Sequence, residues 1–116
     1  MEEFGVRIRA LRRKSGLTQR ALASAAGVDF TYLSKIENGR LEHLPSVKTI
    51  RQLAAALHVD ELELLRLANK VPPILDSISR NRDALRFFRR ATETIQHPQE
   101  WRDLLEFLES RPVKRQ

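Results

Sequence analysis

The stretch that decides the fold is QRALASAAGVDFTYLSKIE, which covers Gln19–Glu37. It reads as two short helices joined by a tight turn around Gly27, a residue that can adopt the positive φ such a turn requires. Apolar residues recur at helical spacing on one face of each helix, so the two faces can pack together. These residues are Leu22, Ala23, Ala26, Val28, Leu33 and Ile36. Ala23 is small enough to let the second helix cross closely over the first.

The second of these helices has a clear start and an outward face. Asp29 has the chemistry of an N-cap, because its carboxylate can accept a hydrogen bond from the backbone N–H of Thr31 or Tyr32. The outward side chains are Phe30, Thr31, Ser34 and Lys35. Two short helices, a sharp turn and an outward-facing second helix describe a helix-turn-helix.

The run GLTQRALASAAGVDFTYLSKIENG, followed by PSVKTIRQLAAALHV, resembles the helix-turn-helix of the phage-repressor-like XRE family. The positions that match the family's spacing are Gln19, Ala23, Gly27, Leu33 and Ile36. The resemblance implies a compact five-helix DNA-binding domain whose second helix lies against the DNA backbone and whose third enters the major groove. We therefore expect an all-α fold, with this domain at residues 1–70 and a C-terminal helical extension at residues 71–116.

The charge balance is compatible with a polyanionic partner, since the formal net charge is +6 and the pI is about 10.5. Residues 1–40 hold 8 Lys/Arg against 4 Asp/Glu, so the helix-turn-helix segment carries most of the excess. The absence of cysteine excludes disulfides, thiolate zinc sites and cysteine nucleophiles. The acidic start MEEF is no secretory signal, and no apolar run could cross a bilayer. We therefore expect a cytoplasmic protein without a membrane partner.

Further helices are expected on both sides of the central motif. Residues 2–14 carry an apolar stripe at Phe4, Ile8 and Leu11, and Gly16 ends this helix. Thr18 is the expected N-cap of the next helix.

A fourth and a fifth helix are expected after the loop Arg40–Pro45, which is about two residues longer than the resemblance implies. Ser46 caps the fourth helix. Its buried face comprises Val47, Ile50, Leu53, Ala54 and Leu57. Asp60 and Glu63 form a capping pair for the fifth helix. The apolar side of that helix comprises Leu62, Leu65 and Leu67.

The pair Pro72-Pro73 interrupts the helical pattern and marks the expected domain boundary. Two or three helices should follow, the last starting at Pro98. Its amphipathic pattern consists of Trp101, Leu104, Leu105 and Leu108. Phe87 and Phe107 lie off the main apolar stripes, so they cover either a partner, such as a second copy in a homodimer, or this chain's own domain.

A basic face precedes the last helix, and a basic, frayed tail at Val113–Gln116 should follow it. The arginines of that face are Arg82, Arg86, Arg89 and Arg90. This face is either a solvated surface or a contact for flanking phosphate or an acidic partner.

The family's base-reading positions fall on Asp29, Phe30, Thr31, Ser34 and Lys35. Lys35 is the best candidate for a donor to guanine O6 and N7, and Thr31 can donate or accept. Phe30 either packs on a thymine methyl or folds back onto the domain, and both readings stay open. For Asp29 we favour the cap, because an unpaired carboxylate would repel phosphate.

Phosphate anchoring should come from Gln19 and Arg20, where the N-terminal amides of the second helix already favour anions. Further candidates are Tyr32, Asn38 and Arg40. The resemblance also implies an ion pair between Arg12 and Glu37 that ties the first helix to the third, a structural role rather than a DNA contact.

The leading hypothesis is a sequence-specific transcriptional regulator, a repressor that binds a palindromic operator as a homodimer, because one such motif contacts too few base pairs alone. The second is an antitoxin or a protease-controlled repressor whose C-terminal helices bind a partner protein. An enzyme comes last, since His43, His58 and His97 lack metal-ligand spacing and no nucleotide cradle or nucleophile motif is present. No cofactor and no metal are expected. Retention of the motif for RNA or protein contact alone is a further alternative.

Overall fold

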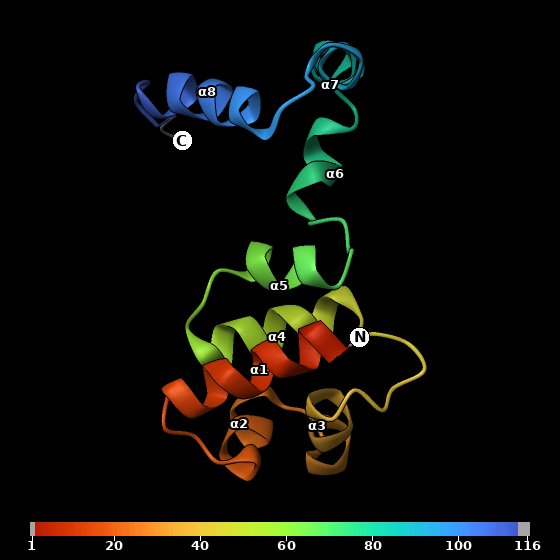
Figure 1. Cartoon of the computed structure of the whole chain (residues 1–116), viewed down its shortest axis with the longest axis vertical. Coiled ribbons are helices and arrows are strands. Elements are labelled where there is room, and N and C mark those ends of the chain that lie inside the picture. Colours follow the sequence, from red (N-terminus) through yellow and green to blue (C-terminus); the bar gives the residue numbers. More distant parts are fainter. Residues whose placement is uncertain (1, 114–116) are drawn as a thin grey trace. The chain divides into compact units, whose positions relative to one another are not determined.

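The computed structural model describes residues 2–113, which form helices and contain no strand. The expected all-α fold is confirmed (Figure 1). In chain order the helices are α1 (Glu2–Lys14), α2 (Gln19–Ala26), α3 (Phe30–Glu37), α4 (Val47–Leu57), α5 (Glu61–Leu67), α6 (Ile74–Ile78), α7 (Arg82–Thr94) and α8 (Pro98–Glu109). Two compact units divide the chain, one ending at Pro73 and the other starting at Ile74. Within the described range, no helix has the length and apolar character that a membrane crossing requires.

The first unit is a three-layer stack of helices. Its middle layer is α1 and α4, with α2 and α3 packed on one side and α5 on the other (Figure 1). Apolar side chains from all five helices meet in one core. The largest fully buried side chains are Phe4, Ile8, Leu22, Leu33, Pro45, Ile50, Leu53, Leu64 and Leu65. Burying this apolar surface is the main favourable contribution to the stability of the unit.

The helix starts follow the local chemistry of the sequence. Thr18, Asp29, Ser46 and Asp60 each accept a hydrogen bond from a backbone N–H of the helix that they precede. These bonds satisfy amide groups that have no partner inside the helix. Gly27 takes φ 69° between α2 and α3, so the expected glycine turn is confirmed.

The prediction for the fifth helix is wrong in two respects. Leu62 is 48% exposed, and Leu64, which is absent from the predicted apolar side, is fully buried. Leu65 is buried and Leu67 packs on the core, as predicted. Glu63 does not complete a capping pair, because its carboxylate accepts a hydrogen bond of 2.8 Å from Nε of Arg7 on α1. The packing of α5 beside α1 brings the guanidinium of Arg7 to this carboxylate, so Glu63 has a tertiary partner in place of the local one.

A close crossing of α1 over α3 depends on Gly5, which the sequence reading did not single out. Gly5 is buried, and a Cβ built there would lie 2.2 Å from the backbone oxygen of Ile36. No side chain fits at that distance, so glycine at this position allows the two helices to meet.

The second unit has well-formed helices but very little core. Ala91 is the one buried residue within Ile74–Val113. Pro98 occupies the first turn of α8, as expected. The large apolar side chains of this unit stay exposed: Ile74, Leu75, Leu85, Phe87, Phe88, Trp101, Leu104, Leu105, Phe107 and Leu108. The four arginines of the basic face are exposed as well. Residues 114–116 of the expected basic tail lie outside the described residues.

Candidate nucleic-acid interface

The outer face of α3 presents two exposed polar side chains one helical turn apart. Thr31 and Lys35 are both exposed, and Ser34 beside them is half-buried. The spacing i, i+4 places Thr31 and Lys35 on the same side of the helix. Asp29 accepts hydrogen bonds from the backbone N–H of Thr31 at 2.9 Å and of Tyr32 at 3.3 Å. Its carboxylate is thus engaged as the cap, as the sequence favours.

Phe30, the first residue of α3, is half-buried and packs against the core of the first unit. The guanidinium carbon of Arg20, from α2, lies 4.2 Å from the centroid of the Phe30 ring. The structure therefore shows Phe30 folded back onto the domain, with the exposed side chain of Arg20 above it.

A buried carboxylate holds α3 against α1 and α2. Glu37 is 3% exposed and receives two hydrogen bonds from Arg12, from Nε to Oε2 at 2.7 Å and from Nη2 to Oε1 at 3.0 Å. Such a two-pronged contact fixes both the distance and the plane of the partners. Nη1 of Arg12 donates to the backbone oxygen of Leu17 at 2.9 Å. The ion pair expected from the sequence is therefore present, and it orients the helix that carries Thr31 and Lys35.

The protonation of Glu37 reflects two opposing effects. Burial by itself raises the pKa of the Glu37 carboxyl, but the hydrogen bonds from Arg12 and Gln19 and the charge of Arg12 outweigh it. The pKa of Glu37 lies below its ordinary value as a result. The pKa of Arg12 is raised, chiefly by its hydrogen bond to Glu37. Both groups are charged at neutral pH.

Two of the expected phosphate anchors also take part in this network. Gln19 donates from Nε2 to Oε1 of Glu37 at 3.0 Å. Asn38 accepts a hydrogen bond from Arg9 and donates to the hydroxyl of Ser34 at 3.4 Å. Replacing Gln19 would therefore alter the internal network as well as any contact with phosphate.

Arg9 is the member of the network that sequence reasoning missed. Its Nε also lies 3.4 Å from Oε1 of Glu37. The available signal was its position one helical turn before Arg12, on the side of α1 that faces α3.

The remaining phosphate candidates lie on α3 and on the loop that follows it. Tyr32 is half-buried and packs on the core, whereas Arg40 is exposed. The loop of Arg40 is held by Leu41 and Leu44, which pack on the core, and by Pro45, which is fully buried. The loop is thus anchored against the domain.

The site offers hydrogen-bond donors and positive charge rather than reactive groups. No cluster of three or more His, Cys, Asp or Glu side chains within residues 2–113 could hold a metal ion. The exposed side chains on α2, α3 and the following loop include Arg20, Thr31, Lys35 and Arg40. Such groups suit contacts to phosphates and base edges.

Sequence comparisons with known proteins also indicate a helix-turn-helix. A family model described as helix-turn-helix matches residues 8–64. The ImmF control region 10 kDa protein of Bacillus phage phi105 is 39% identical over 66 residues, which cover 57% of this chain and 70% of that protein. The HTH-type transcriptional repressor RghR of Bacillus subtilis (strain 168) is 44% identical over 59 residues. This match covers 51% of the chain but only 43% of RghR.

Among solved structures, the chain is similar to SinR. The structure of SinR in complex with DNA, described as the master regulator for biofilm formation, matches with a TM-score of 0.51 and 35% identity. That match covers 53% of this chain and 97% of the SinR chain. The structure of the SinR–SinI protein complex matches with a TM-score of 0.54 and 25% identity, over 93% of this chain and 96% of the matched chain.

Proposed function

This chain belongs to the phage-repressor-like, XRE-type helix-turn-helix family, and we propose that it regulates transcription by binding double-stranded DNA. The observation that carries the proposal is the exposed face of α3, with Thr31 and Lys35 presented side by side on a helix fixed by the Arg12–Glu37 pair. In the proposed complex α3 lies in the major groove, where Lys35 donates to guanine and Thr31 contacts the neighbouring base. Gln19, Arg20, Asn38 and Arg40 contact flanking phosphates.

The proposed DNA-binding form is a homodimer. One α3 reads only a few base pairs, which is too little information for a unique site, whereas two copies about a two-fold axis read an inverted repeat. The half-sites then lie about 34 Å apart, one helical turn of the duplex. Occupation of such an operator within a promoter makes the regulator a repressor, which is the activity named for RghR.

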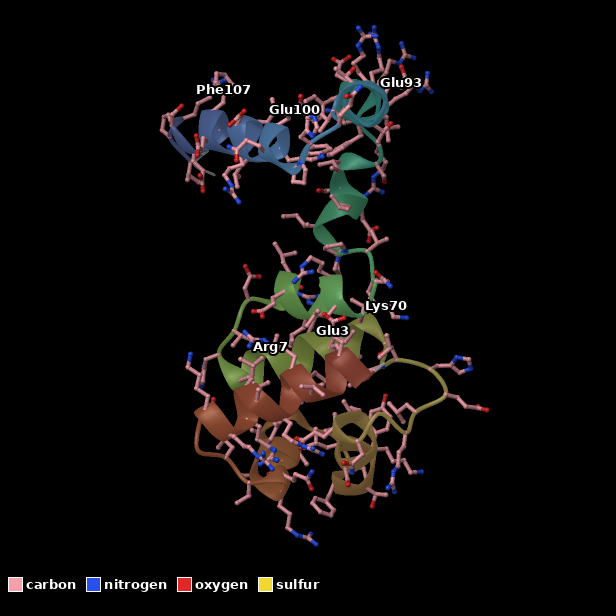
Figure 2. The ribbon with its side chains drawn as sticks, in the orientation of Figure 1. Glu3, Arg7, Lys70, Glu93, Glu100 and Phe107 are labelled. Carbon is pink, nitrogen blue, oxygen red and sulfur yellow. The ribbon has the colours of Figure 1, made fainter. Side chains whose placement is uncertain are left out.

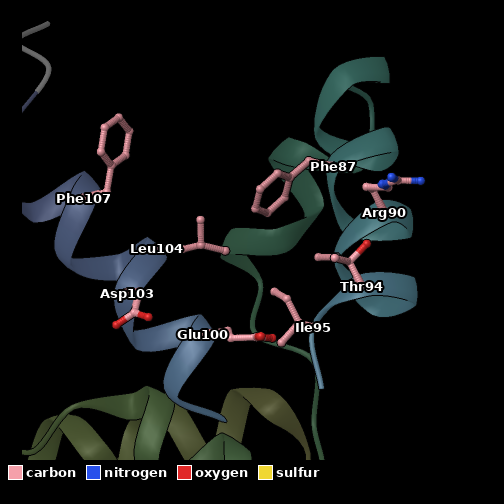
Figure 3. Close-up of a pocket in the computed structure, with 9 residues that line it drawn as sticks. Phe87, Arg90, Thr94, Ile95, Glu100, Asp103, Leu104 and Phe107 are labelled. Atoms are coloured by element: carbon pink, nitrogen blue, oxygen red, sulfur yellow. The ribbon is translucent and has the colours of Figure 1, made fainter. Parts of the chain in front are cut away.

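We assign the dimer contact to the second unit. This unit corresponds to the C-terminal helical extension that the sequence predicts at residues 71–116. A cleft of about 590 Å³ separates α7 from α8, with apolar residues on both walls. Figure 3 shows Phe87 of α7 and Leu104 of α8 at this cleft, and Phe107 one turn further along α8. Exposed apolar side chains in such number are typical of a surface that a partner covers.

The charges of the two helices favour a second copy as that partner. In α7 the four arginines outnumber Asp83 and Glu93, which gives a net charge of +2. In α8 the four acidic residues outnumber Arg102, which gives a net charge of −3. Helix α7 of one chain is thus complementary to α8 of another, and a two-fold arrangement uses both contacts twice.

A second candidate is a regulator whose C-terminal helices bind a different protein, as in an antitoxin or a protease-controlled repressor. The observation that favours it is the similarity to the SinR–SinI complex, because that match extends over the second unit of this chain. Loss of a stoichiometric partner protein on deleting residues 72–116 would support this candidate over the homodimer.

The decisive experiment selects bound duplexes from a random pool with the full chain. We expect an enriched inverted repeat and a complex that contains two chains per duplex. A pool that shows no enrichment, with binding that depends on salt but not on sequence, would instead support a non-specific nucleic-acid contact. The proposed regulator acts in the cytoplasm on DNA and has neither catalytic activity nor a cofactor.

A further inference from the structure

Phe30 and Arg20 form a pair that spans the two helices of the motif. Phe30 is the first residue of α3 and Arg20 the second residue of α2. The guanidinium carbon lies 4.2 Å from the ring centroid, well inside the range of a cation–π contact. The ring is half-buried and also packs against the core of the first unit. Contacts with the guanidinium and with the core therefore hold the ring in place.

We propose that Phe30 is a positioning residue, which holds the guanidinium of Arg20 in place for a DNA phosphate, and that it does not read a thymine methyl. This inference rests on the proposed DNA-binding function and names the role of one position in it. A half-buried ring that is packed on the core and covered by Arg20 presents little surface to a base.

The chemistry of arginine suits this arrangement. The guanidinium is planar, so its flat face can rest on the ring while the N–H groups at its edge remain available for hydrogen bonds. Among the described residues no carboxylate forms a salt bridge with Arg20, whereas Arg7, Arg9, Arg12 and Arg51 are all paired. An exposed arginine normally samples many rotamers, and stacking on Phe30 reduces the entropy that is lost when the side chain binds phosphate.

The test measures how DNA affinity depends on salt, with a random-sequence duplex and with the duplex enriched from the random pool. Each phosphate contact contributes about one unit to the slope of log affinity against log salt. Arg20→Gln removes the charge at an exposed position and should lower the slope by about one unit on both duplexes. Phe30→Leu keeps an apolar side chain but removes the aromatic face. This variant should also lower the slope.

Two further variants separate positioning from a general structural role. Phe30→Tyr keeps the aromatic face and should retain the wild-type slope. Adding Phe30→Leu to Arg20→Gln should change the slope no further, because the group that Phe30 positions is already absent. Melting temperatures of all variants, followed by circular dichroism, show whether a change in slope accompanies a loss of folded protein.

A second arm tests the alternative role of Phe30 directly. Thymines of the enriched duplex are replaced one at a time by deoxyuridine, which lacks only the C5 methyl group. We expect the same losses for the wild type and for Phe30→Leu at every position. A thymine whose methyl matters to the wild type but not to Phe30→Leu would overturn the inference, as would an unchanged slope for a folded Phe30→Leu. Absence of DNA binding by the wild type would overturn the proposed function itself, and the inference with it.

Discussion

Arg12 and Glu37 connect α1 to α3 through two hydrogen bonds of 2.7 and 3.0 Å, in a site where Glu37 is 3% exposed. The two charges compensate each other in a site where burial keeps water from solvating them. No buried side-chain nitrogen or oxygen among the described residues is left without a partner. The position of α3 thus depends on this internal ion pair, and in the proposed DNA complex the pair links stability to binding.

Arg12→Ala should unfold or strongly destabilise the first unit rather than merely weaken DNA binding. The variant leaves Glu37 charged, buried and without its main donor, which costs on the order of 3–5 kcal/mol. The measurement is urea unfolding followed by circular dichroism. Arg13→Ala, at an exposed neighbouring position, is the control and should unfold like the wild type. An Arg12→Ala protein with a wild-type melting temperature but no DNA binding would contradict the structural role.

Acid should weaken the same contact. Because the pKa of Glu37 in the folded chain is below its ordinary value of 4.5, its ionised form stabilises the fold at any pH above that value. This stabilisation declines as the pH falls below about 4.5 and through the folded-state pKa. Urea unfolding at pH 7 and pH 3 should therefore show a stability gap between the wild type and Glu37→Gln that shrinks on acidification. The exposed Glu42→Gln serves as control, and a gap that stays constant would refute the assignment.

Gly5→Ala should destabilise the first unit by about 1–3 kcal/mol, although alanine is the better helix former. The new methyl group would lie 2.2 Å from the backbone oxygen of Ile36, so α1 and α3 would have to separate. Unfolding in urea measures the loss. The matched control is Val6→Ala, since Val6 is 61% exposed on the same helix and its truncation should have little effect. A Gly5→Ala protein as stable as the wild type would show that the crossing tolerates a side chain.

The features that sequence reasoning predicted correctly depend on residues close together in the chain. Thr18, Asp29 and Ser46 cap helices because each has a backbone N–H within two or three positions. Gly27 is constrained in the same local way, by the positive φ of a single turn. Local chemistry of this kind needs no knowledge of the rest of the fold.

The misses depend on partners that are distant in sequence. Glu63 could satisfy a capping pattern, and only the packing of α5 beside α1 brings Arg7 to it. The leucine-rich sequence of α5 fits more than one buried face, and the packing of α5 on α4 decides that Leu64 is buried. Arg9 and Gly5 matter because of α3, whose approach to α1 no local pattern encodes.

Lys35→Ala should relax the preference at one base pair in each half-site and cost about 1–3 kcal/mol there. The reason is that an exposed lysine on α3 donates to a base edge in the proposed complex, while its removal leaves the core untouched. Competition binding with single-base variants of the enriched duplex provides the measurement. The control is Lys70→Ala, which removes the same charge from the end of the first unit near α5, away from α2 and α3 (Figure 2). An equal loss on every duplex for Lys35→Ala would indicate a phosphate contact instead.

Phe107→Ser should convert a dimer into a monomer without unfolding the first unit. Phe107 is 62% exposed on α8 and lines the cleft beside α7, so in the proposed dimer it contacts the second copy rather than its own core. Sedimentation equilibrium measures the change in mass, and the melting temperature of the first unit should stay at the wild-type value. Affinity for a duplex with two half-sites should fall by about 10²-fold or more, because the second contact loses its effective concentration. The control is Val113→Ser, since Val113 is 91% exposed and follows the last helix. If the Phe107→Ser protein sediments as a dimer, the contact between copies lies elsewhere, and the apolar surface of α7 and α8 is then assigned to a different protein.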